Sequence, residues 1–435
     1  MTFHRVQRLD KADAAAELRS VREAVAWKAK LLALGVAVHP GVARARRVNL
    51  TRRHLYDYGI EVPSYDIPYE VILAHIPSLG GRAVAARVRY NPDSPLQLVA
   101  SERDGVVIYD AHDREVRGVE VADLEDFREL EIDGMPLSNV VQRLGCDLLG
   151  VVPTNDCIYY RGGNECRFCE IRPTFQVNRP YPRYRKSVDT MIRASVAAAG
   201  ADPSIECVTY NGGQLAAYDS TVRMYVDLLT RLRDQVETVN LNCTVAVMPP
   251  DDLDLLDQLS AARLDQLSLN TEVMRPDLFE QIAPGKAAYG LGRMFRAMQH
   301  AVEAFPRGRV YSNLVYGMQS LPPDLCTDSW RAEAENTAGL EAAEMLLERN
   351  VVPIYTVYHS AGHSRIGPLS LDHDALLAFT IDYGRLVWNS GLIDRSRGSI
   401  LFNICSIPNS VYNEGWLLAE LEARCAEAVA APGLP

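Results

Sequence analysis

The feature that most constrains the fold of this chain is a strand-then-helix rhythm that starts near Leu148. Short runs of β-branched and apolar residues recur from there, each followed by a stretch with helical periodicity. The runs are DLLGVVP, IECVTY, VNLNCTV, LDQLSLN, VYSNLVYG and VVPIYTVY. Such alternation predicts parallel strands joined by right-handed crossovers. The short connections favour an α/β fold with a TIM-like (β/α)6 barrel, full or partial; the pattern does not fix whether it closes.

The rest of the chain does not share this rhythm. Residues 1–145 begin with an Ala-rich helical stretch and continue with strand-like runs such as GRAVAARVRY and DGVVIYD between turn signals. We therefore expect an N-terminal α+β accessory domain over 1–145, the partial barrel over 146–365 and a C-terminal helical and strand extension over 366–435. A segment at 399–416 is a candidate to close one mouth of the barrel. Since no long Gly/Ser-rich or Pro-rich linker separates these parts, we expect them to pack together.

Composition excludes several classes of protein. Of 435 residues, 48% are hydrophobic and 23% charged, as in ordinary globular proteins rather than disordered or collagen-like ones. The net charge of −11 gives no general attraction to nucleic acid or anionic lipid. The first residues lack the pattern of a signal peptide, and Lys28 and Lys30 interrupt the apolar stretch that follows. These observations predict a cytoplasmic protein that does not enter the membrane.

Three cysteines form the most informative local motif. Cys157, Cys166 and Cys169 have the spacing C-x8-C-x2-C and directly follow the first barrel strand. In a parallel barrel, catalytic groups lie on the loops at the carboxyl ends of the strands, and this loop is one of them. Three thiolates leave one tetrahedral position open, which is typical of metal sites that do chemistry. The other six cysteines stand singly and are expected to be small buried apolar residues.

The cysteine loop resembles that of the radical S-adenosylmethionine (radical SAM) family, over roughly residues 148–360 of the chain. The segment Cys166-Arg167-Phe168-Cys169 is similar to the family's closing C-x-aromatic-C, although eight residues instead of three separate the first two cysteines. The resemblance implies that Cys157, Cys166 and Cys169 hold a [4Fe-4S] cluster and that SAM binds its fourth iron. It also implies that Phe168 lies on the adenine side of SAM.

Later segments extend the resemblance in the expected order. Gly212-Gly213-Gln214 ends the second strand and is similar to the family's Gly-Gly-Glu motif, which contacts the methionine amino group; Gln214 replaces the acid. Two glycines here allow the backbone to approach a ligand closely. On the fourth strand, Asn270 and Glu272 are two residues apart, so an extended chain presents both on one face. The resemblance implies that this pair contacts the ribose or the methionine part of SAM.

The remaining candidate residues come from the fourth to the sixth strands. Arg275 is a candidate partner of the methionine carboxylate, and Gly317 stands where the family has a glycine beside adenine. Our candidates for catalytic side chains on the fifth and sixth strands are Tyr316, His359 and His363. The competing interpretation of the two histidines is that they are ordinary surface or loop residues whose hydrogen bonds are already satisfied.

The activity that the resemblance implies is reductive cleavage of SAM to a 5′-deoxyadenosyl radical, which abstracts hydrogen from a substrate. A small molecule of a biosynthetic pathway is the expected substrate, with a reductase, flavodoxin or ferredoxin as electron donor. Two alternatives stay open. The first is modification of RNA or a peptide, suggested by the basic segments at 179–186 and 43–53, although the acidic chain does not favour a nucleic-acid partner. The second is a metal-stabilised binding protein without enzymatic activity.

Overall fold

A computed structural model describes most of the chain. The described residues are 11–45, 67–79, 82–101, 105–121, 127, 130–145, 147–178, 185–235, 241–359, 364–393 and 409–430. His363, most of the segment at 399–416 and most of both basic segments lie outside these ranges.

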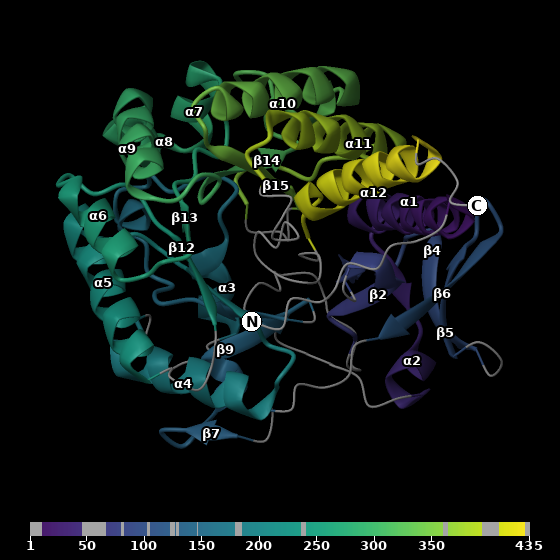
Figure 1. Ribbon diagram of the computed structural model, residues 1–435, viewed down its shortest axis with the longest axis horizontal. Helices are drawn as coiled ribbons and strands as arrows, with labels where there is room; N and C mark the ends of the chain where they lie inside the picture. Colours follow the sequence, from purple (N-terminus) through teal and green to yellow (C-terminus); the bar gives the residue numbers. More distant parts are fainter. Residues whose placement is uncertain are drawn as a thin grey trace.

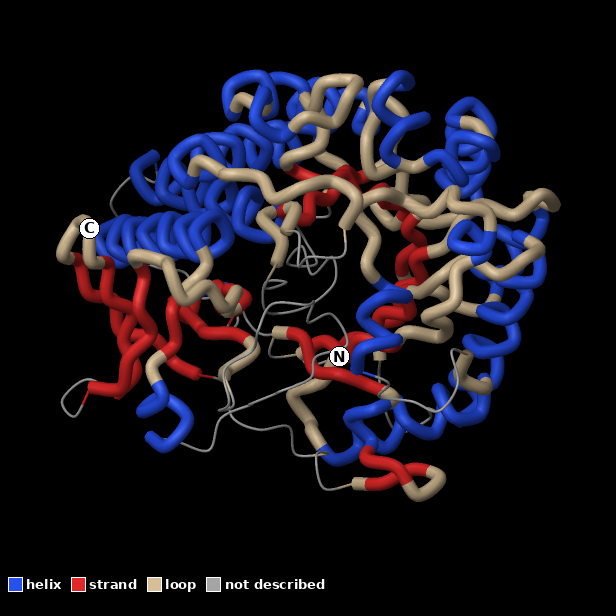
Figure 2. Tube along the Cα trace, turned by 180° about the vertical axis from the view of Figure 1, so that it is seen from behind, coloured by secondary structure: helices blue, strands red, loops and turns tan. Residues whose placement is uncertain are grey.

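The larger sheet contains the six strands that the sequence predicts. Its order is β15-β14-β13-β12-β11-β10-β9, and the strands from β10 to β15 are all parallel and follow chain order. They curve round one after another, as Figure 2 shows. The bounds are β9 Val141–Leu144, β10 Leu148–Val151, β11 Cys207–Asn211, β12 Asn242–Ala246, β13 Gln266–Ser268, β14 Val310–Tyr316 and β15 Val352–Val357. The α/β class and the partial barrel of six parallel strands are confirmed.

Helices cover the outer face of this sheet (Figure 1). Their bounds are α4 Val188–Ala201, α5 Tyr218–Gln235, α6 Asp254–Ala261, α7 Pro276–Ile282, α8 Pro284–Tyr289, α9 Leu291–Ala304, α10 Ala332–Leu347 and α11 His373–Ser390. The short α3 (Ile171–Asn178) instead lies within the curve of the sheet, directly after the cysteine loop. On α5, Val222, Tyr225 and Leu229 are buried along one face, as their spacing predicts. The helices therefore leave the inner face and the carboxyl ends of the strands to form the site.

A second sheet lies beside the barrel, with the order β1-β4-β5-β6-β2-β3 (Figure 1). Its strands are β1 Ala37–Val38, β2 Glu70–Ile76, β3 Arg82–Arg87, β4 Leu96–Ser101, β5 Gly105–Asp110 and β6 Glu115–Val121. Three smaller elements lie in the same part of the sequence: α2 Pro40–Ala45, β7 Glu131–Ile132 and β8 Met135–Pro136. The short apolar runs before residue 145 thus form the small sheet that the turn signals predict.

The first and last helices connect the two sheets. Helix α1 (Lys11–Leu34) contacts α11, β2 and β3, and α12 (Tyr412–Ala430) packs against α1 and α11. Lys28 Nζ of α1 lies 2.7 Å from Glu414 Oε1 of α12, and both side chains are buried. One apolar core runs through both sheets. The domain boundaries at 145 and 365 therefore stay predictions. β9, which precedes residue 145, pairs with β10 of the barrel sheet, and α12, which follows residue 365, packs against α11 and β15.

Among the described residues, no helix has both the length and the apolar character that a membrane span requires.

Candidate functional site

A cavity of about 440 Å³ opens at the carboxyl ends of the parallel strands. Alternate residues of the strands line it, because successive side chains of a strand point to opposite faces of the sheet. From the inner face these are Thr209, Asn211, Thr244, Ala246, Ser268, Asn313, Val315, Ile354 and Thr356. The predicted cysteines Cys157, Cys166 and Cys169 line the same cavity. The structure thus brings the cysteine loop and the strand ends to one place.

Backbone contacts hold the cysteine loop in place. Residues Ile158–Arg161 form a short 3-10 turn after the first cysteine, and Cys169 N donates to Cys166 O at 2.9 Å. Arg167 N donates to Ile282 O at 2.8 Å, which attaches the loop to the end of α7. All three thiols are free of disulfides. The eight-residue gap between the first two cysteines is therefore filled by a defined turn.

Gly212 and Gly213 pack against the cysteine loop. A Cβ atom added to Gly213 would lie 2.9 Å from Asp156 O and from both Cα and Cβ of Cys157. A Cβ atom on Gly212 would lie 2.9 Å from Thr154 O. The close approach expected of these glycines is thus made to the backbone beside the first cysteine, and both residues also line the cavity.

Gln214 follows the glycines and connects them to two elements. Its backbone N–H donates to Cys157 Sγ at 3.4 Å, and its side-chain Nε2 donates to Thr221 Oγ1 of α5 at 2.7 Å. A glutamate in this position could not donate to Thr221 in this way. The amide that replaces the family's glutamate therefore donates a hydrogen bond of its own in this chain.

Asn270 and Glu272 both line the cavity, but not from the extended strand that their spacing implies, because β13 ends at Ser268 and Glu272 has a φ of 69°. Glu272 Oε1 lies 2.6 Å from Lys286 Nζ at the start of α8, and Asn313 Nδ2 donates to Glu272 Oε2 at 3.2 Å. Lys286 Nζ also donates to Asn270 O at 2.8 Å. Sequence reasoning missed Lys286, because a lysine early in a helix gives no local sign of the buried carboxylate that it meets.

Burial and charge act in opposite directions on the ionisable groups of the site. Burial raises the pKa of the Cys157 thiol, and it raises that of Cys169 to about 11. Burial also raises the pKa of Cys166, against which the ammonium of Lys286 acts. For Lys286, burial alone would lower the pKa, but Glu272 and the neighbouring thiols more than offset it and raise the pKa. The site therefore stabilises a cation beside groups that become anionic on metal binding.

The donor set fits an iron–sulfur cluster better than one metal ion. Among the described residues, the three sulfur atoms do not all come within 4.8 Å of one another, although all three line one cavity. A single tetrahedral zinc, with Zn–S bonds of about 2.3 Å, needs its sulfur ligands closer together than a four-iron cluster does. Soft thiolate ligands are those that such clusters take.

Other predicted residues fall into two groups. Phe168 and His359 line the cavity. Arg275 instead pairs with Asp277, with their side chains 2.5 Å apart, and its side chain is 45% exposed. Tyr316 OH donates to Asn336 Oδ1 of α10 at 2.8 Å, and Gly317 N donates to the buried Glu335.

Neither Tyr316, Gly317 nor Arg275 is among the residues that line the cavity, so the structure does not favour their predicted roles. The physical reason for Tyr316 is strand alternation: Asn313 and Val315 face inward, which turns Tyr316 toward the helices. The predicted role of His363 cannot be placed, because this residue lies outside the described ranges.

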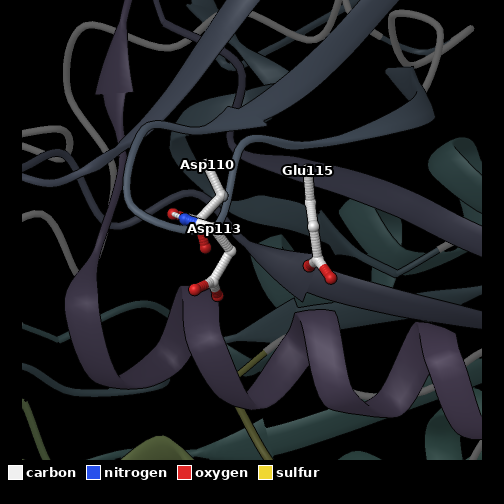
Figure 3. Close-up of side chains that lie close together, drawn as sticks. All are labelled: Asp110, Asp113 and Glu115. Atoms are coloured by element: carbon white, nitrogen blue, oxygen red, sulfur yellow. Dashed lines mark hydrogen bonds between the residues drawn. The ribbon is translucent and has the colours of Figure 1, made fainter.

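Three acidic residues lie close together at the N-terminal sheet, apart from the cavity: Asp110, Asp113 and Glu115 (Figure 3). Lys30 Nζ lies 3.0 Å, 2.6 Å and 3.3 Å from their respective carboxylate oxygens. Asp110 Oδ1 also accepts from the backbone of His112 at 3.0 Å. Since an ammonium already satisfies these carboxylates, they give α1 an anchor on the sheet.

Comparison with known proteins finds one curated relative and several similar solved structures. No family model matches the chain. A bacteriochlorophyllide c C-7(1)-hydroxylase of Chlorobaculum limnaeum is 26% identical over 244 residues, which are 53% of this chain and 60% of the hydroxylase. The chain therefore matches less than two thirds of that relative's length.

Radical SAM enzymes are among the solved structures that the chain resembles. The hydrogenase maturase HydG of Carboxydothermus hydrogenoformans has a TM-score of 0.42 at 14% identity, over 62% of this chain and 59% of its own. A radical SAM methyltransferase of Sphaerobacter thermophilus has a TM-score of 0.36 at 15% identity, over 69% and 76%. Because both TM-scores are below 0.5, the functional argument that follows depends on this chain's own residues.

Proposed function

We propose that this chain, which resembles radical SAM enzymes, binds a [4Fe-4S] cluster and SAM and removes hydrogen from a small-molecule substrate. One observation carries the proposal: three thiols spaced C-x8-C-x2-C line one cavity at the carboxyl edge of a partial barrel. This is where barrel enzymes place their chemistry. When bound, the cluster and SAM together supply a 5′-deoxyadenosyl radical that abstracts the hydrogen.

The residues around the cavity have distinct tasks in this proposal. Cys157, Cys166 and Cys169 bind the cluster, and Lys286 offsets part of the negative charge that their ionisation brings. Phe168, Gly212, Gly213 and Gln214 lie beside the thiols, where SAM has to bind if it chelates the open iron. Asn270 and Glu272 offer hydrogen-bond acceptors to its ribose or methionine part.

The relative's name suggests a direction for the reaction. It describes a hydroxylase that acts at one carbon of a bacteriochlorophyllide. Replacement of a C–H bond by C–OH is therefore a candidate outcome for this chain, within a biosynthetic pathway. SAM would be the net oxidant, being converted to 5′-deoxyadenosine and methionine, and water would supply the hydroxyl oxygen and release a proton. An electron donor such as a flavodoxin or ferredoxin completes the proposal, since reductive cleavage of SAM consumes one electron.

Anaerobic reconstitution tests the proposal. The purified chain is loaded with iron and sulfide, reduced with dithionite and given SAM, and iron, sulfide and 5′-deoxyadenosine are quantified. We expect about four irons per chain and deoxyadenosine formation. Cys157→Ala should lose both, whereas Cys326→Ala should keep both, because Cys326 is a half-buried cysteine that does not line the cavity.

Other results would assign a different function. Stoichiometric zinc, with neither sulfide nor SAM cleavage, would make the chain a metal-stabilised binding protein. A salt-dependent complex with RNA at low ionic strength would favour the RNA-modifying alternative. Equal iron content in the wild type and Cys157→Ala would contradict the assignment of the cysteine loop.

A further inference from the structure

Glu272 has a backbone conformation that residues other than glycine seldom adopt. Its φ of 69° lies in the left-handed region, where a Cβ atom is crowded. Three hydrogen bonds hold it there. Its backbone N–H donates to Asn313 O at 2.9 Å, and its carbonyl oxygen accepts from Val315 N at 2.9 Å and from Gln319 Nε2 at 2.8 Å. Strained residues that are held this firmly cluster at functional sites, so the position of the Glu272 side chain calls for an explanation beyond packing.

The Glu272 carboxylate fixes one ammonium group inside the cavity. Its Oε1 lies 2.6 Å from Lys286 Nζ, which also donates to Asn270 O at 2.8 Å. A lysine side chain is long and flexible, so a single contact would leave its charge free to move. Two acceptors from the same short segment therefore hold this ammonium in one place, and all three residues line the cavity.

Backbone packing brings Lys286 to the cysteine loop. The preceding residue, Gly285, donates its N–H to Asn164 O at 2.9 Å, and Asn164 lies between the first and second cysteines. A Cβ atom on Gly285 would lie 2.7 Å from the same oxygen and would overlap the ring of Tyr159. The first turn of α8 is thus in direct contact with the loop. Lys286 lines the same cavity as the three thiols.

The two charges of the pair act unequally on the thiols. Burial is the main cause that raises the pKa of all three cysteines. The ammonium of Lys286 opposes this rise in pKa at Cys157 and Cys166. The carboxylate of Glu272 adds to the rise in pKa at Cys166 and Cys169, and at Cys166 its effect is smaller than that of the ammonium. The positive charge therefore dominates at the first two cysteines.

We propose that Lys286 raises the reduction potential of the cluster held by the three thiols, and that Glu272 is the residue that positions Lys286 for this. Reduction moves one electron from a donor of the flavodoxin or ferredoxin class to the cluster and breaks no bond. The change is one added negative charge, which a cation in a buried site stabilises. Net charge near the sulfur ligands is among the factors that set the potential of such clusters. The inference rests on the proposed function for the presence of the cluster.

The potential can be measured without SAM or substrate. The reconstituted chain is titrated anaerobically with dithionite in the presence of mediator dyes, and the reduced cluster is followed by electron paramagnetic resonance. In Lys286→Met, we expect the ratio of reduced to oxidised cluster at the wild-type midpoint to fall about tenfold, which is 59 mV for a one-electron couple. Lys286→Arg keeps the cation and should stay close to the wild type. Glu272→Gln removes the opposing anion but leaves Asn270 O as an acceptor for Lys286, so the ratio should rise.

Two further variants separate charge from folding. Arg293→Gln is the matched control, because Arg293 is a paired cation on α9 that does not line the cavity. It should leave the potential unchanged. The double variant Lys286→Met/Glu272→Gln removes both charges and avoids an unpaired buried carboxylate. Its potential should lie between those of the two single variants. Iron content is measured for every variant, and the potential is determined on the fraction that holds a cluster.

The outcomes are distinct. Shifts of opposite sign in Lys286→Met and Glu272→Gln support the inference, whereas a purely structural role of the pair predicts shifts of one sign or none and would overturn it. An equal shift in Arg293→Gln overturns it too. Weaker SAM binding in Lys286→Met, with an unchanged potential, would assign Lys286 to SAM alone and overturn the inference. A wild type that loads no cluster would contradict the proposed function as well, whereas loaded clusters of equal potential would contradict only this inference.

Discussion

Lys286 Nζ and Glu272 Oε1 lie 2.6 Å apart inside the cavity, and their side chains are only 12% and 8% exposed. The pair joins α8 to the segment after β13, on which Asn270 also lies. Because both charges are removed from water, each depends on the other for compensation. The same ion pair therefore contributes to the stability of the barrel and sets the charge of the cavity wall.

Removal of one partner of this pair should be costly. Lys286→Met leaves the Glu272 carboxylate buried with Asn313 as its remaining described side-chain donor. We expect the free energy of unfolding to fall by about 3 kcal/mol in urea titrations of the cluster-free protein. The double variant Lys286→Met/Glu272→Gln should recover a large part of the loss. Equal losses in the single and double variants would show that the pair is not coupled.

Gly213→Ala should disturb the cysteine loop. The added methyl would lie 2.9 Å from the backbone of Asp156 and Cys157, so the loop has to move. We expect lower stability and less iron bound on reconstitution. Gly200→Ala on α4 is the matched control, because nothing lies within 4 Å of its added methyl. It should be neutral or stabilise by about 0.5–1 kcal/mol. Full iron content in Gly213→Ala would contradict the close packing.

The buried pair between the first and last helices should contribute strongly to stability. Lys28→Met leaves the fully buried Glu414 without the ammonium 2.7 Å away. A loss of about 3–5 kcal/mol in the free energy of unfolding is expected. Arg22→Ala, which removes an exposed pair with Glu422 between the same helices, should cost under about 1 kcal/mol. Similar losses in the two variants would argue against the buried pair as a special contact.

His359 should make stability depend on pH. Burial, then Arg89 and Arg87, hold its pKa well below the usual 6.5, so the unfolded chain binds a proton more readily than the folded one. Stability is then full above about pH 6.5 and falls as the pH decreases, by at most about 1.4 kcal/mol per pH unit. His359→Gln should show a shallower fall between about pH 7 and pH 5 in denaturant titrations. Identical profiles for the variant and the wild type would contradict this prediction.

The local pattern of the sequence determined the barrel strands and the place of the cysteines. Strand alternation and helix periodicity are short-range effects of backbone geometry and burial, so the parallel strands follow from the sequence pattern. The approach of Asn270 and Glu272 to the cavity does not, because both lie beyond the end of β13 at Ser268 and Glu272 has a φ of 69°. The same alternation, counted from Asn313, would have turned Tyr316 away from the cavity. Periodicity was thus sufficient to predict the sheet. To predict which single side chains enter the cavity, one also has to know which residues of each strand face inward.

Only the tertiary structure decided which distant charges meet. Lys286 is 14 residues from Glu272, yet their contact depends on how α8 packs against the strand ends. Arg89 lies 268 residues before Val357, whose carbonyl it contacts, and no local pattern couples the two. Such pairs form because packing removes water from both elements and makes an uncompensated charge costly. The sequence by itself determined where the thiols lie, while the packing of an N-terminal sheet against the barrel decided what faces them.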